Sequence, residues 1–390
     1  MAGIYKLEGA IKHYDWGGYT FIPTLLQKEN KEGKPFAEYW MGIHPLGVGQ
    51  VITKDGKNAL TNYSNSLSYL LKVLDVKDML SIQVHPSKEA AEKEYARENA
   101  AGIPLESPQR NYKDDNHKPE LMVALSDFWL LHGFKPAEEL VYTLLNVVEL
   151  RELLPVFNQS GYSGLYKYIM EMPQEEVNRI LQPLLDNIDA IYKEGTRPDK
   201  YDEDYWASKA AKTFVRNGDI DRGIFSIYLF NLVHLKKGEG VFQADGVPHA
   251  YLEGQNVELM ANSDNVLRGG LTTKHIDVVE LMKHIKCEAT TPNILQPEAI
   301  NSDEKKYLTP VNDFQLNVIE LEPNQVATFS TTLTEILLLT EGAVEVSSGD
   351  SSIELKSGSV SAVVLPGTTV VVKGRSKATI YRASTAINNR

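Results

Sequence analysis

The chain has 390 residues, 42% apolar and 24% charged, a composition typical of a globular protein with a large core. Its 40 Lys and Arg against 52 Asp and Glu give a formal charge of −12, which disfavours nucleic acids and anionic membranes as partners because both attract basic patches. Cys287 is the only cysteine, which excludes an intrachain disulfide, and no stretch approaches the ~20 apolar residues of a membrane span. Residues 1–17 show no signal-peptide pattern, so we expect a cytoplasmic protein, as a monomer or a weak homo-oligomer.

Residues 1–86 predict short strands and turns, with a short helix at 67–73 and a strand at 79–85. In that last strand Ser81, Gln83 and His85 share one face, because successive side chains of a strand point to opposite sides. These polar residues form either the solvent face of a half-buried strand or part of a metal site.

The next elements predicted are a helix that begins after Ser87 as N-cap and a break at Gly102-Ile103-Pro104. A polar loop at 111–118 precedes a strand at 119–125, which places Glu120 at the start of that strand. Apolar residues at a spacing of three or four predict a helical block over 136–222 without a cluster of metal-type ligands. After Gly223 we expect strands to the end of the chain, including the apolar run 225–235 and short strands separated by glycine turns from 301 onward.

An internal repeat is visible in the β-rich part of the chain. Residues 235–254 match 355–374 at an offset of 120, and residues 118–125 match 333–340 at an offset of 215. The two offsets differ by 95 residues, close to the length of the helical block. We interpret this as two copies of one β-barrel unit, the first split by a helical insertion; chance similarity of short segments is the alternative.

His249 has Thr369 as its counterpart in the second copy, so this histidine is not needed to build the barrel. Together with Gln83, His85 and Glu120 it predicts a mononuclear site with two imidazoles, one carboxylate and one amide. Zn²⁺ of the catalytic kind fits such a donor set, and Fe²⁺ or Mn²⁺ would fit it too.

The segment 256–274 is unusually polar and glycine-broken for a strand, which suits a loop lining a site. Arg268 and Lys274 supply cations for a phosphate or an oxyanion. The alternative is a polar surface loop that holds an Arg–Asp pair.

A family resemblance rests on six dispersed segments. The chain resembles type I mannose-6-phosphate isomerases at residues 14–17, 39–45, 81–86, 117–120, 248–251 and 263–274. It departs from them at Gly270 and Thr273, where the family more often has other residues and where we expect no chemistry.

The resemblance implies a mainly β fold with an α-helical insertion: two cupin-type (jelly-roll) barrels plus a helical domain. The catalytic barrel is expected to be split over 1–135 and 223–300, with the helical insertion at 136–222 and a second barrel without metal ligands at 301–390. It also implies one zinc ion per chain on Gln83, His85, Glu120 and His249, and a catalytic role for Arg268.

The implied reaction interconverts mannose 6-phosphate and fructose 6-phosphate reversibly, through a metal-stabilised enediol with proton transfer between C2 and C1. Candidates for the general base are Glu258, Asp264, His117 and a metal-bound water, and a carboxylate or the water is favoured. Further candidates for the site are Lys118 in catalysis and, for the substrate and its phosphate, Ser81, Lys118, Lys274, Tyr251 and Trp16.

Two rival functions remain compatible with such a barrel. One is a non-catalytic cupin that binds a sugar or sugar phosphate as a regulator, which would not need Arg268 or its acidic surroundings. The other is a cupin oxygenase or a different sugar isomerase; the Gln83 ligand and the phosphate-type cations argue against an oxygenase.

Overall fold

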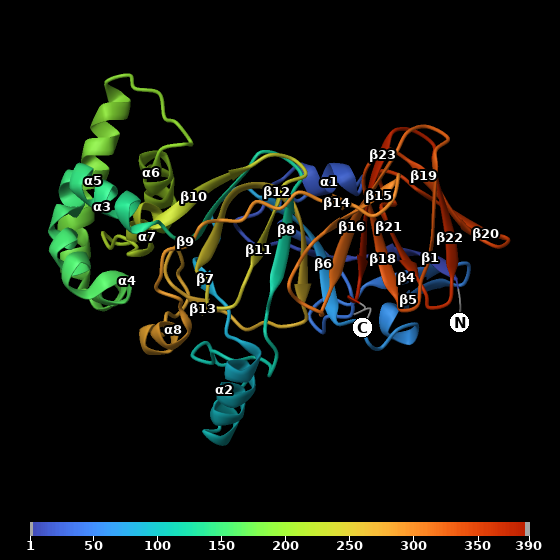
Figure 1. Ribbon diagram of the computed structural model, residues 1–390, viewed down its shortest axis with the longest axis horizontal. Coiled ribbons are helices and arrows are strands. Elements are labelled where there is room, and N and C mark those ends of the chain that lie inside the picture. The colour runs from blue at the N-terminus through green and yellow to red at the C-terminus, as the bar shows by residue number, and fades with distance from the viewer. Residues whose placement is uncertain (1–2, 387–390) are drawn as a thin grey trace.

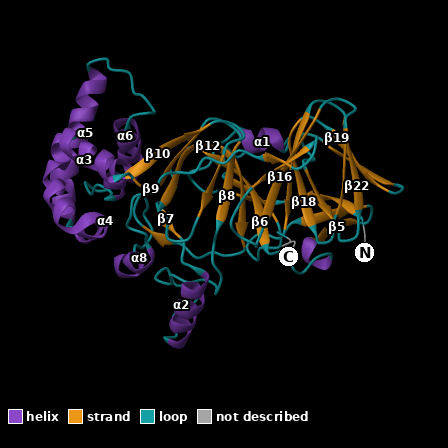
Figure 2. Ribbon diagram, viewed as in Figure 1, coloured by secondary structure: helices purple, strands orange, loops and turns teal. Residues whose placement is uncertain are grey.

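The computed structural model describes residues 3–386, which form a mainly β structure with most of its helices gathered at one end (Figures 1 and 2). The helices are α1 (Phe21–Leu25), α2 (Lys88–Ala100), α3 (Ala137–Asn146), α4 (Leu154–Glu171), α5 (Gln174–Lys193), α6 (Glu203–Phe214), α7 (Gly223–Leu229) and α8 (Val278–His284), with short 3₁₀ turns at Leu60–Asn62 and Val148–Leu153. Over this range no helix is both long and apolar enough to cross a bilayer.

The middle of the molecule is a ten-stranded sheet in which β12 pairs with four other strands. Its strands are β2 (Ala10–Lys12), β3 (Glu38–Met41), β6 (Tyr69–Val76), β7 (Gln83–Val84), β8 (Glu120–Ala124), β9 (Phe128–Phe134), β10 (Phe230–Leu235), β11 (Gly240–Gln243), β12 (His249–Ala261) and β13 (Leu267–Arg268).

The other end holds a nine-stranded and a four-stranded sheet. The nine-stranded sheet contains β1 (Ile4–Glu8), β4 (Gln50–Thr53), β5 (Gly56–Ala59), β14 (Glu298–Ala299), β15 (Glu304–Tyr307), β16 (Gln315–Leu321), β18 (Glu335–Glu341), β21 (Ser361–Val364) and β23 (Ala378–Ser384). The smaller one contains β17 (Val326–Ser330), β19 (Val344–Ser348), β20 (Ser351–Leu355) and β22 (Thr369–Gly374). Strand β1 pairs with β21, so the start of the chain is built into the C-terminal sheet. As paired among the described residues, the sheets are open rather than closed into barrels.

The strand pairings of the two β regions correspond. In the first, β8 pairs with β11 and β12, and β9 pairs with β10 and β12. In the second, β18 pairs with β21 and β23, and β19 pairs with β20 and β22. The connection from β9 to β10 carries α3 to α7, whereas β19 and β20 are joined only by Gly349 and Asp350.

Strand β12 bends sharply at Gly254, and this bend shapes the site. Gly254 has φ of 129°, and a Cβ there would lie 2.6 Å from the Phe128 ring and 2.7 Å from the Asp127 carbonyl oxygen. The two halves of β12 therefore face each other, as the hydrogen bond from the Tyr251 hydroxyl to Glu258 shows (2.9 Å). Glycine is required here both for its conformation and for lack of space.

The helices predicted over 136–222 are present, but short apolar runs were assigned wrongly elsewhere. Residues 67–73 were predicted as a helix and lie largely in strand β6, every residue of which is buried. The run 225–235 was predicted as a strand and begins as helix α7, also buried throughout. Such runs carry no helical or strand period, because burial on all sides removes the polar face that would reveal one.

Two further differences concern the neighbourhood of the site. The strand predicted at 79–85 is reduced to Gln83 and Val84 as β7. Helix α8 was missed because strands were expected throughout; its signal was the N-cap Asp277, whose carboxylate accepts the Glu280 N–H at 2.9 Å.

Packing against the helices determines which way β7 faces. Ile82 and Val84 are fully buried in one apolar core with Leu131 of β9 and with residues of α3 to α7. Because side chains alternate along extended chain, Gln83 and His85 point to the opposite side, away from that core.

The C-terminal sheet contains a buried ion-pair cluster centred on Arg382. Its guanidinium contacts Glu335 through Nε–Oε2 (2.5 Å) and Nη2–Oε1 (3.0 Å), and Glu304 through Nη1–Oε1 (2.9 Å). Glu335 is the counterpart of Glu120 in the sequence repeat. In this sheet an arginine therefore balances the buried carboxylate.

We expect Arg382→Met to lower the free energy of unfolding by about 3–5 kcal/mol, because it leaves two buried carboxylates without a counter-charge. The matched control is Arg375→Met, whose partner Glu345 and own side chain are solvent-accessible (32% and 51% exposed), and it should cost at most about 1 kcal/mol. Urea unfolding of both variants measures the difference; equal losses would contradict a buried cluster.

Candidate metal centre

Three side chains from separate strands converge on one buried point. His85 directly follows β7, Glu120 begins β8 and His249 begins β12. His85 Nε2 lies 3.5 Å from Glu120 Oε1, and His249 Nε2 lies 3.5 Å from Glu120 Oε2. The three residues are at most 4% exposed, and one ligand atom from each lies within 4.8 Å of the others.

The hydrogen bonds of the two imidazoles leave their Nε2 atoms for a ligand. His85 Nδ1 donates to the Asn265 carbonyl (2.8 Å), and His249 Nδ1 donates to the Val247 carbonyl (3.0 Å). With Nδ1 protonated in both rings, the Nε2 lone pairs point toward the carboxylate, and His85 Nε2 has no hydrogen-bond partner. This arrangement fits a divalent cation, since metal-bound histidines usually donate their other N–H to a carbonyl or carboxylate.

Gln83 lies beside the three clustered residues. It is the ladder partner of His249 on one side and of Arg268 on the other. Its side chain lines a cavity of about 60 Å³ together with Glu120 and His249.

The charges around the cluster keep its ligands in their metal-binding forms. Burial alone would raise the pKa of Glu120, but Lys118, whose Nζ lies 2.9 Å from Oε1, and His85 outweigh it and hold the pKa well below its usual range. Burial lowers the pKa of His85 to about 4, against the opposing charge of Glu120. At neutral pH the carboxylate is ionised and the imidazole is neutral, as metal binding requires.

A second layer of charge lies next to the cluster. Lys72 Nζ lies 3.0 Å from Glu258 Oε1 and 3.7 Å from Glu38 Oε2, and Tyr251 donates to Glu258 Oε2. Burial raises the pKa of Glu258 although Lys72 opposes it. Both carboxylate oxygens of Glu258 are therefore occupied by neighbours.

A larger cavity of about 590 Å³ lies next to the small one, and Gln83 lines both cavities. The predicted site residues that also line the larger cavity are Trp16, Ser81, Lys118, Asp264, Arg268 and Lys274. Tyr251 and Glu258 line the small cavity instead. His117 lines neither; its Nε2 lies 3.0 Å from the Asp313 carboxylate.

Two of the cations that line the larger cavity have no carboxylate partner among the described residues. Within residues 3–386, Arg268 and Lys274 form no ion pair. Burial lowers the pKa of Arg268, and burial together with Arg268 lowers that of Lys274. An entering anion would relieve both the desolvation and the repulsion.

Asp264 is the candidate base that lines the larger cavity, where Asp15, Glu38 and Asp78 are the other acidic lining residues. Its side chain is 40% exposed, and Oδ2 lies 3.3 Å from His44 Nε2. Burial would raise the pKa of Asp264, but the hydrogen bond from His44 and the positive charges of Lys118 and Lys72 together lower the pKa below its usual value.

Several residues of the cavity were missed in the sequence. Lys72 was detectable as a charge within the apolar run 69–76, whereas Arg216 reaches the cavity from a turn after α6 and gave no signal. Other missed lining residues are Glu38, Trp40, His44, Thr213 and Phe214.

Known proteins similar to this chain agree with the geometry. A sequence model described as "Phosphomannose isomerase type I, catalytic domain" matches residues 4–137. Mannose-6-phosphate isomerase of Shigella flexneri is 34% identical over 95% of this chain and 97% of its own length, and the Homo sapiens enzyme is 31% identical over 87% and 88%.

Two solved structures resemble the fold. The Salmonella typhimurium mannose 6-phosphate isomerase bound to fructose 6-phosphate and zinc has a TM-score of 0.85 and 30% identity, covering 99% of this chain and 100% of its own. A mannose 6-phosphate isomerase bound with zinc and yttrium matches with the same score, identity and coverage. The chain therefore belongs to the family of type I mannose-6-phosphate isomerases.

Proposed function

We propose that this chain interconverts mannose 6-phosphate and fructose 6-phosphate reversibly, with one zinc ion. The observation that carries this function is the buried His85–Glu120–His249 cluster, whose Nε2 atoms converge on one carboxylate beside a cavity with unpaired cations. The curated relatives carry this activity in their name, and the similar Salmonella structure holds fructose 6-phosphate and zinc.

His85, Glu120 and His249 would hold the zinc ion, and we include Gln83 as the fourth ligand. The support for Gln83 is its place opposite His249 in the ladder and its contribution to the same small cavity. Zinc bound there supplies a Lewis acid that stabilises negative charge on substrate oxygens.

The isomerisation requires a base that removes the C2 proton and returns it to C1, through an enediol. Asp264 is the better placed of the two candidate carboxylates, because it is ionised and exposed to the larger cavity. Glu258 is 3% exposed, pairs with Lys72 and accepts a hydrogen bond from Tyr251. This arrangement suits a carboxylate that orients the Lys72 side chain. We therefore propose Asp264 as the base and Glu258 as an orienting group.

The cations of the larger cavity have two tasks in this proposal. Arg268, adjacent to Gln83 in the ladder and free of a carboxylate, would donate hydrogen bonds to the oxygen on which charge develops. Lys274 and Ser81 would bind the phosphate, and Trp16 would contact the sugar. Lys118 lines both cavities and so lies between the larger cavity and the metal centre. Arg216 adds a further cation from the helical segment.

For the architecture we propose two cupin-type units, the first interrupted by the helical insertion at 136–222. The matched strand pairings and the two-residue counterpart of the β9–β10 connection support it. The catalytic unit comprises most of 1–135 and 223–300 and the other unit 301–390, to which β1, β4 and β5 add strands. The net charge of −12 supports a monomer or weak homo-oligomer without nucleic-acid or membrane partners, and the single cysteine supports the cytoplasmic location that we also propose.

Turnover of mannose 6-phosphate should be lost on prolonged chelation and restored by added zinc, because the cluster needs a cation to bind the reacting oxygens. An assay coupled to fructose 6-phosphate formation, before and after chelation, measures this. Zinc binding without turnover would instead favour a non-catalytic sugar-phosphate protein.

Changing Gln83, His85, Glu120 or His249 to Ala should lower bound zinc and turnover together, since each removes a proposed ligand. The matched control is Glu335→Ala, which removes the corresponding carboxylate of the second unit and should keep zinc in the folded protein. Metal analysis of the purified variants decides, and full zinc occupancy in all four would refute the site.

Arg268→Ala should reduce kcat by about 10²–10³ while zinc stays bound, because it removes a donor to the developing charge. Arg197→Ala, at an exposed position of the helical segment, serves as control and should leave kcat unchanged. Loss of zinc from Arg268→Ala would show that this arginine is structural.

A further inference from the structure

Two loops that flank the metal centre are locked together by buried polar groups. The first, residues 111–118, leads into β8 and Glu120; the second, residues 262–266, joins β12 to β13. Asn265 is the centre of the lock and is fully buried. Its Oδ1 accepts the Lys113 N–H (2.7 Å), and its Nδ2 donates to the carbonyls of Asp114 and Asn116 (2.8 Å each).

The Asp114 carboxylate completes the lock from the other loop. Oδ1 accepts the Ser263 hydroxyl (2.8 Å) and the Asn116 N–H (3.0 Å), and Oδ2 accepts the Asp264 N–H (2.8 Å). All these donors belong to the two loops. The Asp114 carboxylate thus connects the two loops, and losing one of these partly buried hydrogen bonds would cost stability.

The lock is coupled to the metal centre through one atom. The Asn265 carbonyl oxygen accepts the His85 Nδ1–H at 2.8 Å. The hydrogen bonds of the Asn265 side chain fix the position of this carbonyl. The bond from Nδ1 to the carbonyl sets the tautomer and the ring angle of His85, and so the direction of its Nε2. The same segment carries Asp264 toward the cavity.

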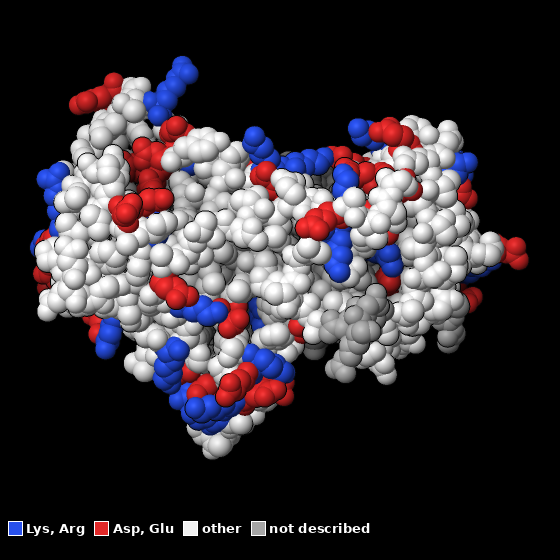
Figure 3. All heavy atoms as spheres, viewed as in Figure 1, with Lys and Arg blue, Asp and Glu red and all other residues white. Residues whose placement is uncertain are grey.

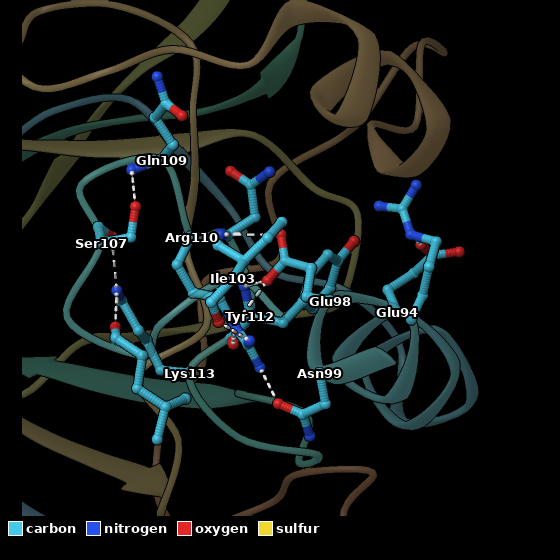
Figure 4. Close-up of polar contacts among 12 residues, drawn as sticks. Glu94, Glu98, Asn99, Ile103, Ser107, Gln109, Arg110, Tyr112 and Lys113 are labelled. Atoms are coloured by element: carbon cyan, nitrogen blue, oxygen red, sulfur yellow. Dashed lines mark hydrogen bonds and ion pairs between the residues drawn. The ribbon is translucent and has the colours of Figure 1, made fainter. Parts of the chain in front are cut away.

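Helix α2 supports the first loop from outside (Figures 1 and 4). Arg110 pairs with Glu98 (2.8 Å) and donates to the carbonyls of Ile103 and Tyr112 (2.6 Å each) and to Asn99 (2.7 Å). Glu98 in turn accepts the Tyr112 N–H (3.0 Å). The exposed side of α2 mixes acidic and basic side chains (Figure 3). The buried side of the helix thus fixes the path of the chain directly before Lys113.

We propose that Asp114 and Asn265 are positioning residues that preset the His85 tautomer and thereby the zinc affinity of the site. The inference rests on the proposed function only through the zinc site. It states that the ring is fixed before metal binds, so the effect must be visible in the metal-free protein.

The test compares Asp114→Asn with Asp115→Asn in the full-length protein. The first replaces one of the two accepting oxygens of Asp114 with an N–H₂ group, which faces a donor instead of accepting its hydrogen bond. The second makes the same change at the neighbouring exposed residue. We expect zinc affinity, measured by competition with a chromophoric chelator, to fall about 10–100-fold in Asp114→Asn only. Equal zinc affinity in both variants would overturn the proposal.

A second readout separates positioning from general destabilisation. In metal-free protein with ¹⁵N-labelled histidine, the wild type and Asp115→Asn should show His85 as the Nδ1–H tautomer, and Asp114→Asn a mixture of tautomers. A lower melting temperature with the tautomer and zinc affinity unchanged would mean a merely structural role and would refute the proposal.

Ser263→Ala provides a milder variant should Asp114→Asn fail to fold. It removes one of the bonds to Asp114 and should weaken zinc binding less, in the same direction. Unchanged zinc affinity in this variant would contradict the proposal. Neither zinc affinity nor the tautomer depends on turnover, so absence of isomerase activity in the wild type would refute the function while leaving this inference intact.

Discussion

The bend of β12 at Gly254 is the constraint on which the site depends. The ladder places Glu120 opposite Met260, far along the strand from His249. Because β12 bends at Gly254, the carboxylate and the imidazole meet, with their atoms 3.5 Å apart. This bend requires a glycine, since the Phe128 ring and the Asp127 carbonyl occupy the space that a Cβ would need.

Charge balance explains why so many ionisable groups tolerate burial here. Three buried carboxylates, Glu38, Glu120 and Glu258, lie with two buried ammonium groups, Lys72 and Lys118, which gives a formal charge of 2 − 3 = −1 with neutral imidazoles. A divalent cation changes this to +1, a sign suited to an anionic intermediate. Each carboxylate has a fixed partner, so the layer is preorganised rather than rearranged on binding.

The second β region has the same pairing pattern around a carboxylate that is paired with an arginine. Glu335 occupies the strand position that corresponds to Glu120 but is neutralised by Arg382, and Thr369, the counterpart of His249, shares a hydrogen bond with Ser330. Matching strand pairings therefore do not imply matching chemistry. What differs is the charge that each region provides for one buried carboxylate.

The sequence by itself identified His85, Glu120 and His249 as metal-type residues, because histidine and glutamate in short motifs stand out against apolar strands, whereas Gln83 as a ligand stays a prediction. It also predicted the helices of 136–222, whose amphipathic period survives, and the repeat, through shared glycines and apolar runs. Only the tertiary structure decided whether fully buried runs form a strand, as 69–76 does, or a helix, as 223–229 does, because these runs have no polar face to give a period. It alone also placed Arg216 in the cavity, turned His117 toward Asp313, and made the Asn265 backbone the partner of His85, because such contacts arise from chain crossings rather than from residue type.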